Sequence, residues 1–198
     1  MYREISKYVF DCDHCPTRCD GKSKMVYSFE DDVIFAEKHE KIIIQKLIDK
    51  GYNARKCEKD GYPDILVSKK NKGLFYIEVK AQRRTFMSVR KLLPQANLYP
   101  SETIALNLSD LLRYFEIAQQ DKVKIFIVWV LENRPCITDG QTLYFLQSLE
   151  KLKEIYNHYG DKRRFRRKSG EGDVVDGVHK GVVVNYHFSL KELKLWKI

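Results

Sequence analysis

The alternation of apolar and polar residues predicts helices and strands that follow one another along the chain. A helical pattern covers residues 30–50, with acidic residues in its first turn and Gly51 at its end. Two apolar strands follow at Ile65–Val67 and Leu74–Val79, and a short polar turn joins them. This spacing predicts a hairpin directly after the first helix.

The second half of the chain continues the alternation. Val123–Leu131 is a near-continuous apolar run, which is typical of a central strand covered on both faces. The other predicted elements are a strand at 103–108, a helix at 109–120, a strand at 142–146, a helix capped by Ser148, an edge strand at 182–188 and a last short helix opened by a capping box at Ser189–Glu192. This order predicts an α/β domain around a mixed central sheet flanked by helices.

Composition narrows the class of partner. The 198 residues suit one domain, which we place at 30–198, preceded by a Cys-rich segment at 1–29. The excess of 36 Lys and Arg over 27 Asp and Glu gives a net charge of +9, which favours polyanions, with nucleic acid ahead of anionic membranes. The sequence contains neither an apolar leader nor an apolar run long enough to cross a bilayer, so we expect a cytoplasmic protein with no membrane partner.

The predicted hairpin carries charges inside apolar strands. Glu78 and Lys80 stand two residues apart, so they project from the same face of their strand. If the two strands pair, Asp64 at the start of the first comes round beside Glu78. Buried charges are costly unless they are paired. The pattern therefore fits either a salt bridge on a half-solvated sheet face or a functional site.

A third carboxylate lies on the preceding helix. Its apolar side is formed by Val33, Ala36, Ile43, Ile44, Leu47 and Ile48. Glu40 falls in the middle of that side, where a carboxylate needs a partner in the core or at a site. The alternative is that Glu40 lies at the mouth of the core and bonds a lysine.

Cysteines gather near the N-terminus. Cys12 and Cys15 form a C-x2-C pair, whose thiolates can bind one metal ion, and Cys19 adds a third candidate ligand. A fourth ligand could be His14, an aspartate or Cys57. Zinc, an iron–sulfur cluster and three free thiols remain the alternatives.

Two basic clusters are candidates for contacts with phosphates. Arg83 and Arg84 follow the strand that carries Lys80. The second cluster, residues 162–168, combines one aromatic side chain with lysines and the four arginines Arg163, Arg164, Arg166 and Arg167. Such a cluster suits backbone phosphates with one stacked base. The alternative is a solvated loop.

These residues together resemble the PD-(D/E)XK nuclease superfamily, which includes restriction-endonuclease-like, RecB-like and Holliday-junction-resolvase-like members. Pro63-Asp64 matches the Pro-Asp motif, Glu78-Val79-Lys80 matches Glu-x-Lys, and Glu40 matches the glutamate of the first helix. The resemblance covers residues 32–131 as the core and, more loosely, 142–198. It implies a restriction-endonuclease-like core and a metal-dependent nuclease that hydrolyses DNA phosphodiester bonds.

The resemblance also implies roles for individual residues. Asp64, Glu78 and the backbone carbonyl of Val79 would bind Mg²⁺ or Mn²⁺, and the cation would polarise the phosphate and activate a water. Lys80 would orient that water or stabilise charge in the transition state. Glu40 would bind a second metal or a metal-bound water.

Other features of the family match only in part. Gln95 and Tyr99 fit the Gln-x3-Tyr motif of RecB-like nucleases and make Gln95 a candidate catalytic residue, but Pro94 and Pro100 interrupt the helix that normally carries it. RecB-like relatives often hold an iron–sulfur cluster through four cysteines, whereas this chain has no C-terminal group of cysteines. By analogy with resolvase-like members we expect a homodimer. A non-catalytic nucleic-acid-binding protein of the same fold and a zinc-knuckle interaction protein are the alternative functions.

Overall fold

A computed structural model describes residues 3–15, 19, 29–70, 73–166, 174–175, 178–179 and 184–197. Its helices are α1 (Phe29–Asp49), α2 (Val89–Leu92), α3 (Leu108–Gln120), α4 (Pro135–Thr138) and α5 (Leu149–Tyr159), with 3₁₀ turns η1 (Pro94–Ala96), η2 (Gly160–Arg163) and η3 (Leu190–Glu192). Its strands are β1 (Glu4–Ser6), β2 (Val9–Phe10), β3 (Asn53–Lys56), β4 (Ile65–Lys69), β5 (Gly73–Gln82), β6 (Thr103–Asn107), β7 (Lys124–Leu131), β8 (Leu143–Ser148), β9 (Arg164–Arg166), β10 (Val174–Val175), β11 (Val178–His179), β12 (Val184–Ser189) and β13 (Lys194–Leu195).

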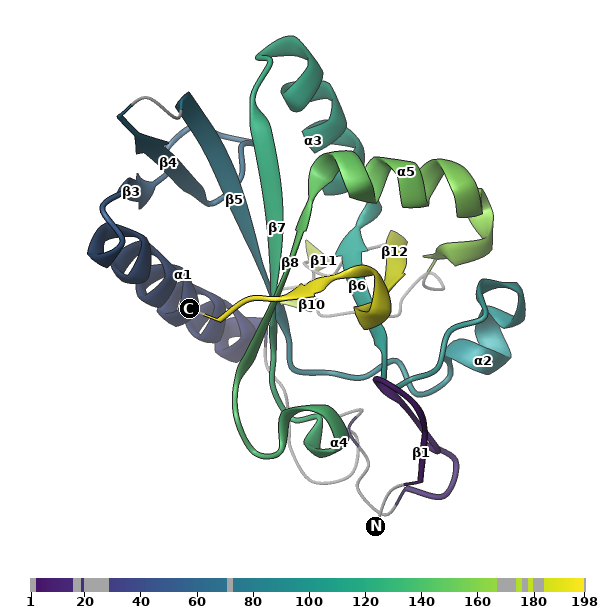
Figure 1. The fold of residues 1–198 in the computed structure, drawn as a ribbon. Helices are drawn as coiled ribbons and strands as arrows, with labels where there is room; N and C mark the ends of the chain where they lie inside the picture. The colour runs from purple at the N-terminus through teal and green to yellow at the C-terminus, as the bar shows by residue number, and fades with distance from the viewer. Residues whose placement is uncertain are drawn as a thin grey trace.

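A six-stranded mixed sheet forms the centre of the molecule, in the order β13-β8-β7-β5-β4-β3. The neighbours β5 and β7 run parallel, and the other pairs in this sheet are antiparallel. The connection between β5 and β7 contains α3, as a parallel crossover requires. The predicted fold class, an α/β domain with a mixed central sheet flanked by helices, is confirmed (Figure 1).

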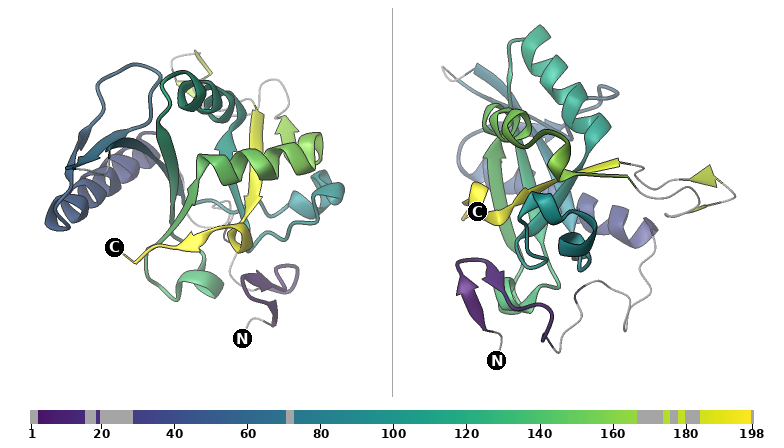
Figure 2. Two further views of the ribbon diagram at one scale, coloured as in Figure 1. Left: turned by 45° about the horizontal axis from the view of Figure 1, so that its top comes forward. Right: turned by 90° about the vertical axis from the view of Figure 1, so that its right-hand side faces the viewer.

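Helices cover both faces of this sheet, with α1 on one side and α3 and α5 on the other (Figures 1 and 2). On the α1 side, Ile43 and Leu47 pack against residues such as Ile77. On the opposite side Trp129 belongs to a larger core that α3, α5 and a smaller sheet, β6-β12-β9, complete. Because both faces are covered, β7 is apolar along nearly its whole length, as its sequence predicts.

The first helix differs in detail from its prediction. It ends at Asp49, and Gly51 follows with φ of +75°, a conformation that glycine adopts without strain. Val33 and Ile48, predicted on the apolar face, are 39% and 45% exposed. The reason is that α1 meets the sheet through β3 and β5, which cover only a narrow stripe of the helix. His39 extends that stripe, and its ring lies 2.7 Å from the hydroxyl oxygen of Tyr144.

The C-terminal elements also differ. The predicted edge strand, β12, pairs on both sides, with β6 and with β9. The capping box at Ser189 and Glu192 is confirmed, but it opens the 3₁₀ turn η3 instead of a helix. The chain then forms β13 and Trp196 donates its backbone N–H to the carbonyl of Tyr144, because pairing with β8 competes with helix formation.

The N-terminal strands β1 and β2 are tied to the domain by hydrogen bonds. The hydroxyl of Ser101 accepts from the backbone N–H of Phe10 at 3.0 Å and donates to the carbonyl of Tyr8 at 2.9 Å. The backbone N–H of Thr85 donates to the carbonyl of Cys19 at 3.0 Å. Among the described helices, none combines the length and the apolar character that a bilayer crossing demands.

Candidate active site

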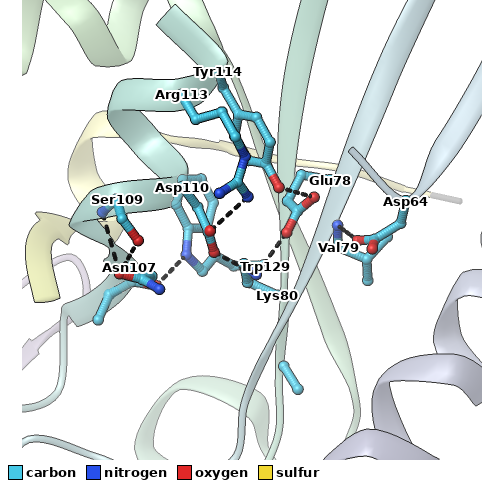
Figure 3. A network of polar contacts seen from close by, with 12 residues as sticks. Asp64, Glu78, Val79, Lys80, Asn107, Ser109, Asp110, Arg113, Tyr114 and Trp129 are labelled. Carbon is cyan, nitrogen blue, oxygen red and sulfur yellow. Dashed lines mark hydrogen bonds and ion pairs between the residues drawn. The ribbon is translucent and has the colours of Figure 1, made fainter. Parts of the chain in front are cut away.

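The β4–β5 hairpin brings the first two predicted site residues together. Ile65 pairs with Ile77, so the next position in this register sets Asp64 opposite Glu78. Asp64 accepts a hydrogen bond from the backbone N–H of Val79 at 2.8 Å (Figure 3). The local sequence therefore fixes the carboxylate of Asp64 against the strand that carries Glu78.

Glu78 and Lys80 form the salt bridge that their spacing predicts. The Nζ of Lys80 lies 2.6 Å from Oε1 of Glu78, and Glu78 is only 2% exposed. This contact matches the simpler interpretation of the hairpin. Among the described contacts, however, Asp64 has no cation of its own at hydrogen-bonding distance. A salt bridge between Glu78 and Lys80 therefore does not explain the charge of Asp64.

Helix α3 adds two residues that sequence reasoning missed. The hydroxyl of Tyr114 donates to the second oxygen of Glu78 at 2.6 Å, and Asp110 lies 3.4 Å from Nζ of Lys80 (Figure 3). Asp110 and Tyr114 are four residues apart and so share one face of α3. The sequence signal that could have indicated both residues is an aspartate one helical turn before a tyrosine, on the otherwise apolar side of α3.

A further arginine connects this helix to the turn before Asp64. Arg113 pairs with Asp110 at 2.7 Å and donates from Nε to the carbonyl of Gly61 at 2.8 Å. Gly61 has φ of +76°, which other residues rarely adopt. The polar network thus runs from the Gly61 turn through α3 to Lys80 and Glu78, and it fixes both sides of the hairpin.

Glu40 approaches Asp64 from α1. It is 8% exposed, and its negative charge contributes to the raised pKa of Asp64. Its carboxylate also lies 3.7 Å from Nζ of Lys56. The contact with Lys56 agrees with the simpler alternative considered for Glu40, and its role at the site remains a prediction.

The electrostatics of the site reflect an excess of negative charge. Burial, followed by the charge of Glu78, raises the pKa of Asp64 to about 7, although the hydrogen bond from the Val79 N–H and the charge of Lys80 act in the opposite direction. Burial alone would lower the pKa of Lys80, but Glu78 and Asp110 raise it above its ordinary value, so Lys80 stays a cation. Burial and the charge of Glu78 raise the pKa of Tyr114, which remains a neutral donor.

This donor set fits a hard cation. Carboxylate oxygens are the ligands that Mg²⁺ and Mn²⁺ prefer. The raised pKa of the buried Asp64 indicates that its carboxylate has too little positive charge nearby, and a metal ion would supply that charge. In the described ranges no three Cys, His, Asp or Glu side chains are close enough to hold an ion by themselves. A cation at Asp64 and Glu78 would complete its coordination with water or a backbone carbonyl such as that of Val79, and Mg²⁺ commonly retains waters.

The structure places Gln95 away from these residues. Gln95 is exposed in η1, and η1 contacts α2 and η2. Pro94 begins this 3₁₀ turn, and Asn97 ends it in a left-handed conformation, so the long helix of the RecB-like motif does not form. The prediction that Gln95 joins Glu40 and Asp64 has no support in this arrangement.

The structure argues against one of the predicted phosphate contacts, Arg163, because its side chain is buried. It is 3% exposed, lies over the ring of Tyr159 at 3.5 Å and pairs with Glu192 at 2.7 Å. Arg163 was counted with its basic neighbours, but the 3₁₀ turn η2 directs it inward. Arg164 and Arg166 are exposed, with Arg164 paired to Asp161 at 3.4 Å.

The remaining predicted contacts have different surroundings. Arg83 pairs with Asp32 at 3.2 Å and Glu132 at 3.3 Å, and Arg84 pairs with Asp32 at 3.2 Å. Both arginines are half-buried, so part of their charge is already matched within the protein. Arg167 lies outside the described residues.

Among the N-terminal cysteines, Cys12 interacts with Ser101 and with Arg134, which follows β7. Cys12 and Cys15 are half-buried, and a turn joins them in which the N–H of Cys15 donates to the carbonyl of Cys12 at 3.4 Å. Cys19 is buried, and none of the cysteines is part of a disulfide. Among the described residues these cysteines do not form a group that could hold a metal ion, so their role as metal ligands remains a prediction.

Neither a protein-family model nor a curated protein sequence matches this chain. The fold is similar to that of a Holliday junction resolvase. That protein is Hjc from the archaeal hyperthermophile Archaeoglobus fulgidus; the match covers 80% of this chain and 86% of that chain, at 11% identity and a TM-score of 0.43.

Proposed function

We propose that this protein is a metal-dependent nuclease that hydrolyses phosphodiester bonds in DNA. The observation that carries the proposal is the meeting of Asp64, Glu78 and Lys80 on one hairpin, with Glu40 acting on Asp64 from α1. A buried cluster with more carboxylates than cations is costly unless a cation joins it. Polar residues of α3 hold the cluster in place, which is what an active site requires.

Mg²⁺ or Mn²⁺ would be held by Asp64, Glu78 and the carbonyl of Val79, where the cation would polarise the phosphate and make a bound water acidic. Asp64 contributes a carboxylate fixed by one backbone N–H. Lys80 contributes a permanent ammonium, able to orient a water or to offset charge on the phosphate oxygens. Glu40 can accept a proton or a hydrogen bond from water at the edge of the cluster.

Binding to DNA is proposed from charge. The chain carries a net charge of +9, and Arg166 is an exposed arginine of β9 without an ion pair among the described contacts. Arg164, Arg83 and Arg84 would exchange their internal carboxylate partners for phosphates, which weakens their expected contribution. A homodimer, expected by analogy, is testable by the mass of the purified protein in solution.

The test is cleavage of plasmid and branched DNA with Mg²⁺ or Mn²⁺. Wild type should cleave, Lys80→Ala should lose at least about 100-fold in rate, and the exposed Lys46→Ala should cleave normally. DNA binding by Lys80→Ala should persist, because the phosphate contacts lie elsewhere.

Two outcomes would reject the proposal. If wild type binds DNA but never cleaves it, the fold serves a non-catalytic binding protein. If wild type and Lys80→Ala cleave equally, the cleavage does not come from this site.

A further inference from the structure

Both carboxylate oxygens of Glu78 have a donor in this structure. Oε1 lies 2.6 Å from Nζ of Lys80, and Oε2 accepts a hydrogen bond from the hydroxyl of Tyr114 at 2.6 Å (Figure 3). The side chain of Glu78 is only 3% exposed, so these two contacts take the place of water. A metal ion that binds Glu78 together with Asp64 must therefore compete with one of the two donors.

Lys80 is the donor that a metal ion displaces more easily. Tyr114 is a neutral donor, and its ring is fixed in the core on the α3 side, where it is 2% exposed. Lys80 is a cation on a flexible stem, and its side chain is 30% exposed. Two cations on one carboxylate repel each other, whereas a neutral hydroxyl does not oppose the metal. Glu78 can therefore keep its bond to Tyr114 while it exchanges Lys80 for a metal.

This exchange would leave Lys80 without a counterion. The charges of Asp64 and Glu78 together balance one divalent cation. An ammonium beside that cation then needs another anion, because a partly buried charge without a partner is unfavourable. Asp110 is in range, since its Oδ2 already lies 3.4 Å from Nζ of Lys80.

Asp110 is fixed in place by contacts that do not involve Lys80. Its Oδ1 pairs with Arg113 at 2.7 Å, which leaves Oδ2 facing the ammonium. It lies in the first turn of α3, where the helix dipole favours a negative charge. The side chain of Asn107 caps that turn by accepting from the backbone N–H of Ser109 at 3.2 Å. Asp110 is thus an anion held ready beside Lys80, and its side chain is 17% exposed.

We propose that Asp110 is a positioning residue, which binds the Lys80 ammonium once Glu78 has exchanged it for a metal ion. The inference rests on the proposed function, because it assumes the metal site of Asp64 and Glu78. In the metal-free protein Lys80 neutralises Glu78, and with metal bound it moves to Asp110. The ammonium therefore stays beside the metal instead of turning to solvent, and α3 influences cleavage through Lys80.

A simpler role for Asp110 is to pair with Arg113, and asparagine separates the two roles. Asp110→Asn keeps the size of the side chain, and its amide oxygen can still accept from Arg113. It removes the charge that Lys80 needs, but in the metal-free protein Lys80 retains Glu78. We therefore expect Asp110→Asn to fold, and we expect its defect to emerge when metal binds.

The test is a titration of the purified protein with Mn²⁺, followed by electron paramagnetic resonance in the absence of DNA. Asp110→Asn should bind Mn²⁺ about tenfold more weakly than wild type, as the loss of one charge-assisted hydrogen bond predicts. Asp110→Glu, which keeps the carboxylate, should recover most of that affinity. Glu116→Gln is the matched control, because it removes a negative charge from an exposed position of the same helix, and it should bind as wild type.

A double substitution shows whether Asp110 acts through Lys80. Lys80→Ala removes the competing cation, so it should bind Mn²⁺ at least as tightly as wild type. In that background Asp110→Asn should change the affinity by less than about threefold, because the two side chains act as one unit. An equal loss of affinity in both backgrounds would make Asp110 a general source of negative charge and would overturn the proposal.

The outcomes separate this inference from the proposed function. Asp110→Asn that binds Mn²⁺ as tightly as wild type would overturn the inference alone. Wild type that binds no Mn²⁺ would overturn the metal site and the inference with it. Where wild type cleaves DNA, Asp110→Asn should lower kcat at saturating Mg²⁺ and leave KM for DNA unchanged, because its effect is on Lys80.

Discussion

Replacing Asp64 with asparagine should stabilise the protein while it removes activity. Burial and Glu78 raise the pKa of Asp64 from 3.8 to about 7, so the folded state holds the charged carboxylate at a cost. Asparagine has the same shape and can still accept the hydrogen bond from the Val79 N–H. The substitution therefore removes the charge and keeps the contact.

The effect of Asp64 on the free energy of unfolding depends on pH. The folded-state pKa of Asp64 lies above the unfolded value, so the folded state binds more protons between pH 3.8 and 7, and stability falls as pH rises through that window. Below pH 3.8 both states are protonated, and this carboxyl costs nothing. Above pH 7 the cost is complete, and it is at most about 4 kcal/mol, from about 1.4 kcal/mol for each pH unit between the two pKa values.

The assay is thermal and urea unfolding with a chelator present, from pH 4 to pH 8. At pH 8 we expect Asp64→Asn to be about 2–4 kcal/mol more stable than wild type, which is roughly 4–16 °C for a domain of this size. Near pH 4 the two should unfold alike. The exposed Asp60→Asn serves as the control and should behave as wild type at every pH.

Magnesium supplies an independent arm of the same experiment. Wild type at pH 8 should gain stability when Mg²⁺ is added, by about 2.7 kcal/mol at a concentration of 100 times Kd, and Asp64→Asn should gain little. An Asp64→Asn protein no more stable than wild type at pH 8 would refute the electrostatic reasoning. An equal response of both proteins to Mg²⁺ would remove Asp64 from the metal site.

Three further substitutions test the surroundings of the site. Tyr114→Phe removes a hydrogen bond to the buried Glu78, so the free energy of unfolding should fall by about 1–3 kcal/mol, measured by urea unfolding, and an unchanged value would contradict the contact. Arg163→Ala leaves Glu192 without its buried partner and should cost about 3 kcal/mol of stability, while the salt dependence of DNA binding stays as in wild type. Arg166→Ala should do the reverse, leaving the unfolding midpoint unchanged and lowering the slope of log Kd against log salt by about 1 if Arg166 contacts a phosphate.

The local features of this protein could be predicted from its sequence alone. The helical period and Gly51 determined α1, the run from Val123 to Leu131 determined β7, and the capping box at Ser189 formed as its spacing requires. The hairpin also followed from local signals, and with it the meeting of Asp64 and Glu78. These features depend on residues close together in the chain, and so periodicity, turn residues and caps are enough to predict them.

The distant residues that complete the candidate site could be identified only in the folded structure. Asp110 and Tyr114 reach Lys80 and Glu78 because the crossover between two parallel strands sets α3 over that face of the sheet. The inward direction of Arg163 was also invisible in the sequence, since the sequence does not show whether a basic side chain faces solvent or a buried partner. Contacts of this kind arise from the packing of elements far apart in the chain, and no local pattern of residues encodes them.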